Sequence, residues 1–149
     1  MAPFFNAGPR LIASVAGVTE LSARFAVDGW DERPIPGLSD ESSGGWVGAV
    51  EMRKTFTTGL VGTSVALFVS SGDVDGQRSY FAAERITASV GDDSEQGSVT
   101  VHHGGLESAP DSWFGHIVPQ SGTGAMAGWS GSARIIHDDQ GAYFEFQLS

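Results

Sequence analysis

The sequence lacks cysteine altogether and holds a single lysine, Lys54, among its 149 residues. Without cysteine the chain has no disulfide, no thiolate nucleophile and no cysteine-based zinc or iron–sulfur site. Basic residues are scarce too, because 8 Lys and Arg residues face 18 Asp and Glu residues, which gives a formal net charge of −10. A chain this acidic repels phosphate, so we expect neither nucleic acid nor an anionic membrane as a partner.

Long hydrophobic runs are also missing. No apolar run approaches the roughly 20 residues needed to cross a bilayer, and residues 1–5 lack the charged start of a signal peptide. We therefore expect a cytoplasmic location. The length of 149 residues suits one domain, so we expect a single β-barrel domain over residues 1–149.

Helical periodicity is scarce, whereas short runs rich in β-branched and aromatic residues recur between clusters of Gly, Ser and Asp. Their spacing of roughly 8–12 residues is typical of an all-β meander that forms a sandwich or a closed barrel. Two segments lie outside this pattern. We expect residues 1–18 to form a docked strand or a flap, and residues 33–45 to form an irregular loop. The predicted strands are residues 21–27, 49–56, 64–70, 79–90, 97–103, 112–118, 122–129, 131–137 and 142–148.

Strand alternation places the single lysine inside the predicted barrel. In residues 50–56 the even positions are apolar apart from Lys54, so its side chain should point inward. Glu84, which alternates with Tyr80 and Ile86, is the expected partner. Burial lowers the pKa of a lysine unless a carboxylate compensates. Two interpretations of the pair stay open: a structural ion pair that fixes the strand register, and a catalytic or ligand-binding pair.

Two histidines are candidates for chemistry near neutral pH. His103 alternates with Val101, and His116 alternates with Phe114. A histidine there could act as a general acid or polarise a carbonyl, and the alternative is a hydrogen-bonded structural histidine. The neighbouring His102 should point to the opposite face from His103, and no third ligand is suitably spaced, so we expect no metal site.

Residues 121–124, Ser-Gly-Thr-Gly, resemble neither a phosphate loop nor a nucleophile motif. The phosphate-loop lysine is missing, no helix pattern follows, and Gly-x-Ser-x-Gly is absent. We expect the glycines to allow a tight turn or bulge. Trp30, Trp113 and Trp129 fall near the ends of predicted strands, where an aromatic ring can wall the mouth of a cavity and stack on a polyene or an enone.

Several segments resemble an uncharacterised bacterial family, the domain of unknown function 3224, which is related to the allene-oxide-cyclase-like barrels. The resemblance spans roughly residues 20–149, and its most specific part is Val-Pro-x-Ser-Gly-Thr-Gly at residues 118–124. The other segments are residues 25–30, 54–56, 83–85, 97–99 and 103–105. The resemblance implies an eight-stranded antiparallel, calycin-like barrel with a central cavity. It also implies that the related barrels include cyclases of lipid epoxides or polyketide polyenes, in which the barrel holds a flexible chain folded for reaction.

From these observations we expect a cofactor-independent cyclase or isomerase that holds a hydrophobic, unsaturated small molecule in the barrel. The alternative is a non-catalytic carrier or sensor of a lipophilic metabolite. Barrels of this type often form homodimers or homotrimers, and no interface pattern distinguishes the two here. The predicted polar catalytic residues are Lys54, Glu84 and His103. The predicted substrate-binding residues are Trp30, Phe56, Tyr80, Trp113, His116, Met126 and Trp129.

Overall fold

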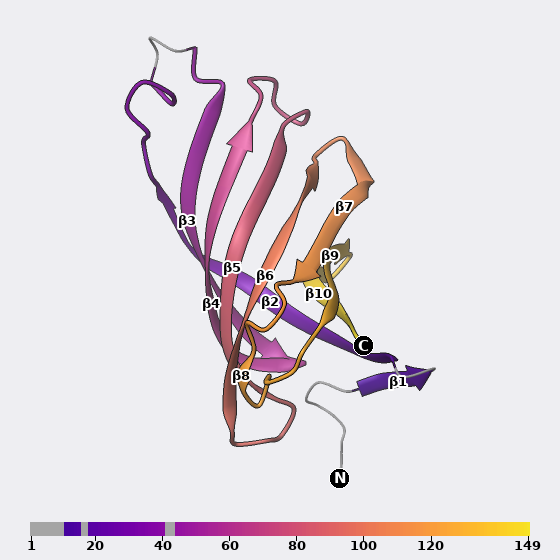
Figure 1. The fold of residues 1–149 in the computed structure, drawn as a ribbon. Coiled ribbons are helices and arrows are strands. Elements are labelled where there is room, and N and C mark those ends of the chain that lie inside the picture. The colour runs from indigo at the N-terminus through magenta and orange to yellow at the C-terminus, as the bar shows by residue number, and fades with distance from the viewer. Residues whose placement is uncertain (1–10, 16–17, 41–43) are drawn as a thin grey trace.

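The structure is a computed structural model that describes residues 11–15, 18–40 and 44–149, with side chains described from residue 19 onward within these ranges. Antiparallel strands dominate it (Figure 1). The strands are β1 (Leu11–Val15), β2 (Val18–Glu32), β3 (Val47–Thr58), β4 (Leu60–Ser71), β5 (Ser79–Val90), β6 (Gln96–Leu106), β7 (Ala109–Ile117), β8 (Thr123–Gly124), β9 (Gly131–Asp138) and β10 (Gly141–Leu148). No helix in the described ranges is long and apolar enough to cross a membrane.

The sheet closes on itself through β2. The strand order is β1-β2-β10-β9-β7-β6-β5-β4-β3, and an additional pairing joins β2 to β3. The first part of β2 pairs with β10 and the second part pairs with β3, because β2 has 15 residues and crosses the whole barrel wall (Figure 1). Closure removes the unpaired sheet edges. The prediction of an eight-stranded antiparallel barrel is confirmed, with β1 and β8 attached outside the eight.

A close approach of β7 and β9 completes the closure, and glycine makes it possible. A Cβ added at Gly115 would lie 1.5 Å from the carbonyl oxygen of Ala133. Any side chain at this position would therefore push the two strands apart.

Three sequence-based expectations concern the segments around the barrel. Residues 11–15 of the expected docked strand or flap form β1, which pairs with β2, whereas residues 1–10 and 16–17 lie outside the described residues. In the expected irregular loop, residues 33–40 and 44–45 contain no strand, and residues 41–43 lie outside the described residues. The strand predicted over residues 122–129 is wrong. Only β8 forms there, because successive turns follow it, with Gly124 and Gly128 at positive φ.

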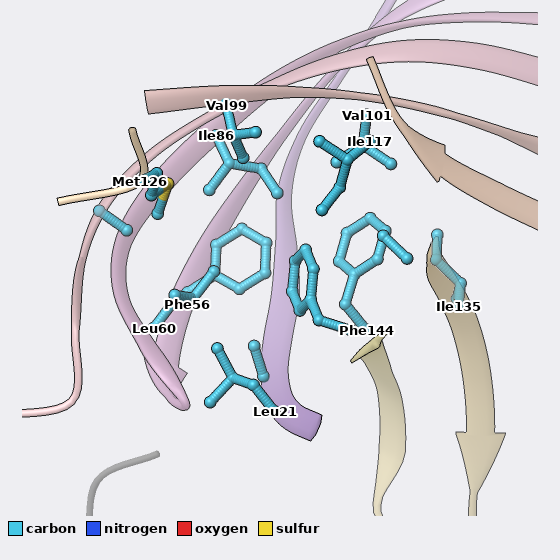
Figure 2. Packing of buried hydrophobic residues seen from close by; sticks show 14 residues of the cluster. Leu21, Phe56, Leu60, Ile86, Val99, Val101, Ile117, Met126, Ile135 and Phe144 are labelled. Atoms are coloured by element: carbon cyan, nitrogen blue, oxygen red, sulfur yellow. The ribbon is translucent and has the colours of Figure 1, made fainter. Parts of the chain in front are cut away.

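The buried apolar side chains gather at the end of the barrel that contains β8 and the β5–β6 turn, which lies at the bottom of Figure 1. Large apolar side chains from the surrounding strands point toward one another there (Figure 2). We call this end the filled half. Its largest fully buried residues include Leu21, Phe56, Leu60, Ile86, Val99, Val101, Met126, Phe144 and Phe146.

Candidate functional site

Four buried polar side chains form a layer across the middle of the barrel. We call it the polar layer; it consists of Lys54, Ser64, Glu84 and His103, which come from the adjacent strands β3, β4, β5 and β6. Each is at most 3% exposed. These residues all occupy inward-facing positions of their strands. Lys54 also lies directly opposite Ser64 in the sheet register, so their side chains lie at the same level of the barrel.

Glu84 is the centre of the polar layer. Its Oε1 accepts a hydrogen bond from Lys54 Nζ at 2.8 Å and lies 2.9 Å from His103 Nε2. Its Oε2 accepts a hydrogen bond from the Ser64 hydroxyl at 2.6 Å. The predicted pairing of Lys54 with Glu84 is therefore present, and both carboxylate oxygens have donors.

Burial and charge pairing set the protonation states in this layer. Burial alone would raise the pKa of Glu84, but the hydrogen bond from His103 and the charge of Lys54 outweigh it and lower that pKa to about 2. Burial lowers the pKa of Lys54, and the Glu84 carboxylate opposes this shift only in part. Burial also lowers the pKa of His103. Near neutral pH the layer thus contains an anionic Glu84 beside a neutral imidazole.

Tyr80 continues the hydrogen-bonded chain toward the open end of the barrel. Its hydroxyl lies 3.1 Å from His103 Nδ1. Its ring stacks on Phe68 with the centroids 4.9 Å apart and meets the edge of Trp113 at 5.5 Å. Burial, followed by the negative charge of Glu84, raises the pKa of the Tyr80 hydroxyl, which therefore keeps its proton. The ring contacts fix where this hydroxyl points.

Above the polar layer the barrel is hollow. A pocket of about 430 Å³ opens among the turns β4–β5, β6–β7 and β9–β10, at the end opposite β8 in Figure 1. This volume lies within the usual range of small-molecule sites. We call this end the pocket half. Its lining consists of Phe25, Val27, Trp30, Met52, Lys54, Ala66, Phe68, Ser70, Arg78, Ser79, Tyr80, Ala82, His103, Glu107, Trp113, Ile135, His137 and Ala142.

Five predicted site residues line this pocket. They are Lys54 and His103 at its base and Trp30, Tyr80 and Trp113 on its walls. The sixth, Glu84, is fully buried and does not line it, so its contacts with Lys54 and His103 make it a positioning residue. The pocket thus occupies one half of the barrel.

The remaining four predicted binding residues lie elsewhere, and each needs correction. Phe56 and Met126 point inward but belong to the packed core of the filled half, and Trp129 packs against that core, with its ring 5.6 Å from Phe146. His116 is exposed on the outer face, because β7 turns its odd positions inward. Alternation along a strand gives a side but not a depth, which explains the error at Phe56. Met126 and Trp129 lie in the turns after β8 instead of on the expected strand.

Sequence reasoning missed part of the pocket wall. Phe25 continues the inward alternation of β2, and this signal was available in the sequence. Phe68 faces inward with Ser64 and Ala66 of β4, but the odd positions of that strand are the more apolar ones, so apolar alternation does not indicate it. Arg78, Glu107 and His137 join the pocket from strand ends and turns, where no local pattern indicates them. Across the described part of the chain, no three His, Asp or Glu side chains are grouped as a metal site would require.

These features define a closed eight-stranded barrel with one apolar pocket above a buried ion pair. The chain belongs to the family described as Protein of unknown function (DUF3224), whose model matches residues 21–149. It is similar in fold to the crystal structure of a protein of unknown function from this family from Shewanella oneidensis MR-1. The two chains are 24% identical, the TM-score is 0.70, and the match covers 89% of this chain and 97% of the other. No curated protein matches the chain.

Proposed function

We propose that this barrel binds a hydrophobic, unsaturated small molecule in the pocket and directs its cyclisation or isomerisation without a bound cofactor. One observation carries the proposal: an apolar, aromatic-walled pocket ends on the ammonium of Lys54 and the imidazole of His103. The aromatic walls suit a conjugated chain, and the polar base can fix one oxygen of it. We also propose that the family falls within the allene-oxide-cyclase-like barrels, which the single closed antiparallel sheet supports.

The chemistry follows from confinement. A flexible polyene loses little further entropy on ring closure once the pocket holds it folded, and well-oriented intramolecular reactions gain on the order of 7–11 kcal/mol in this way. Lys54 can orient a carbonyl oxygen because its ammonium carries three donors and Glu84 takes one of them. The carboxylate of Glu84 balances that charge inside the barrel.

A carrier or sensor is the second candidate, and one observation favours it. Every oxygen of the Glu84 carboxylate already has a partner inside the protein. A site with satisfied polar groups can hold a ligand without transforming it.

Occupancy of the pocket is tested first with a neutral fluorescent probe, N-phenylnaphthylamine. The side chain of Ala82 lines the pocket, and the next residue of β5, Ala83, is exposed on the outer face. We expect Ala82→Phe to abolish probe binding and Ala83→Phe to leave it unchanged. If Ala82→Phe does not fold, Ala66→Leu fills the same pocket more gently. Equal probe binding by the pocket variant, Ala82→Phe or Ala66→Leu, and by the control variant Ala83→Phe would overturn the proposed site.

Turnover is tested with pseudoionone, a linear unsaturated ketone that closes to ionone rings, and with a panel of conjugated trienones of similar length. We expect the wild type to form cyclised or isomerised product faster than buffer and faster than Ala82→Phe, as measured by chromatography. If the protein binds members of the panel and converts none of them, the proposal of an enzyme is overturned and the carrier is favoured.

A further inference from the structure

The chain Tyr80–His103–Glu84 has defined donors and acceptors. The Glu84 carboxylate accepts only, so His103 Nε2 carries a proton and donates to Oε1 at 2.9 Å. In the neutral imidazole Nδ1 then has a free lone pair, and the Tyr80 hydroxyl, 3.1 Å away, donates to it. This is the arrangement by which a histidine held by a carboxylate accepts a proton from a neighbouring hydroxyl.

The outer end of this chain is the end that faces the pocket. Tyr80 lines the pocket, whereas Glu84 is sealed beneath it. Lys54, on the same pocket, lies with Nζ 4.2 Å from the centroid of the Phe25 ring, and among the described residues Glu84 is its hydrogen-bond acceptor. The pocket therefore presents a proton-accepting hydroxyl and an ammonium with unused donors to one ligand.

From this juxtaposition we propose that Tyr80 is the catalytic proton-transfer residue of the pocket, and that the substrate is an enolisable, unsaturated ketone whose carbonyl oxygen binds Lys54. This assignment rests on the proposed function and names the substrate class and the residue that reacts with it. His103 passes the proton, and Glu84 is a positioning residue that holds His103.

The proton balance of the step closes without a co-reactant. A C–H bond beside or conjugated to the carbonyl breaks, and its proton moves to the Tyr80 oxygen as the Tyr80 proton moves to His103 Nδ1. The electron pair of that bond moves onto the ligand oxygen, which becomes an enolate held by Lys54. The imidazolium next to Glu84 then returns its proton to Tyr80, and Tyr80 protonates the same carbon or the distal one, which shifts the double bond.

The test measures proton transfer directly, with α-tetralone as a small enolisable probe in D₂O. We expect the wild type to accelerate deuterium exchange beside the carbonyl, followed by NMR, at least about tenfold over Ala82→Phe. Tyr80→Phe should reduce the protein-dependent part of the exchange rate about 100-fold. If the wild-type acceleration is smaller than this, the rate should fall to that of Ala82→Phe. Tyr80→Phe should keep its affinity for N-phenylnaphthylamine because the ring stays in place, and it should stay folded with a slightly lower thermal midpoint because His103 Nδ1 loses its hydrogen-bond donor.

The matched control is Tyr143→Phe, which removes the hydroxyl of the other tyrosine in the chain, a residue that stacks on Arg24 instead of lining the pocket. Its exchange rate should equal that of the wild type. Three outcomes would overturn the assignment of Tyr80. The exchange rate could be unchanged in Tyr80→Phe, or it could fall equally in Tyr143→Phe. The wild type could also bind α-tetralone without accelerating its exchange. If Tyr80→Phe still converts pseudoionone, the proposed function stands and only the assignment of Tyr80 fails. If the wild type does not bind N-phenylnaphthylamine, the proposed function and the assignment both fail.

Discussion

The filled half and the pocket half are built from the same strands, yet one packs solid and the other stays hollow. Along β5 the inward residues run from Ile86 in the filled half through Glu84 to Ala82 and Tyr80 in the pocket half. Small inward residues create the space, because an alanine leaves a volume that a phenylalanine or isoleucine would occupy. The tyrosine ring stands on the wall of that space and is held there by its neighbours.

The polar layer separates the two halves, and aromatic rings support it. Below it, Phe144 meets the edge of His103 at 5.5 Å and lies 5.1 Å from Lys54 Nζ. Phe25 covers Lys54 from the side of the pocket. The ion pair thus sits where hydration is lost, and a ligand can reach it only through Lys54, which lines the pocket. Stability should depend mainly on the filled half and the polar layer, and ligand binding mainly on the pocket half.

The largest expected effect contrasts two phenylalanines. Phe144→Ala should lower the free energy of unfolding by about 4 kcal/mol, because it leaves a cavity in the packed core. Phe68→Ala should cost about 1 kcal/mol, since this ring already borders open space. Urea denaturation of both variants measures the difference. Equal losses would mean that the two halves contribute alike to stability.

Removal of the central carboxylate comes next. Glu84→Gln should cost about 3 kcal/mol at neutral pH, because it leaves the charge of Lys54 buried without a partner. Since burial lowers the pKa of Lys54, that residue can lose its proton at a lower pH than an exposed lysine, and the deficit should shrink as the pH rises. Glu145→Gln is the control: on β10 its side chain lies on the opposite face from the buried Phe144 and Phe146, away from the polar layer, so it should change stability far less. A deficit that stays constant with pH would speak against an uncompensated lysine.

Acid should weaken the polar layer in a defined window. The pKa of Glu84 is about 2 in the folded protein and 4.5 in its ordinary state, so between these values the unfolded chain binds more protons. The stabilisation is therefore complete above pH 4.5 and is lost as the pH falls toward 2, by on the order of 3 kcal/mol. The gap in urea midpoint between wild type and Glu84→Gln should narrow over this window. A constant gap would contradict the linkage.

The smallest effect on stability belongs to the rim of the pocket half. Trp30→Ala should change the free energy of unfolding by less than about 0.5 kcal/mol, because the side chain is 54% exposed. It should nevertheless weaken N-phenylnaphthylamine binding about fivefold, through loss of one stacking ring. Trp46→Ala removes a similarly exposed tryptophan that does not line the pocket, and should leave binding intact. Equal weakening by both variants would place the probe outside the pocket.

Local sequence pattern predicted much of the barrel. The strand expected at residues 79–90 is β5, and alternation correctly turned Lys54 and Glu84 inward as partners. It failed at residues 122–129, where small residues and glycines that suit either a strand or a turn form turns after β8. Apolar alternation shows that a residue faces the interior, and it contains no information on which neighbours meet it there.

A bulge in β2 illustrates what local pattern misses. Val27 lies opposite Lys54 and Gly29 lies opposite Arg53, so one residue, Asp28, is extra on β2. The bulge reverses the alternation, and as a result both Val27 and Trp30 line the pocket although one has an odd and the other an even number.

The sequence by itself determined the all-β class, the inward face of most strands and the presence of one lysine with one carboxylate partner, because these depend on residue type and on a period of two. The tertiary structure alone decided that β2 closes the barrel, that Tyr80 and His103 extend the ion pair into a hydrogen-bonded chain, and that the hollow lies on one side of it. Those features depend on the depth at which residues from distant strands meet, which is set by register and closure.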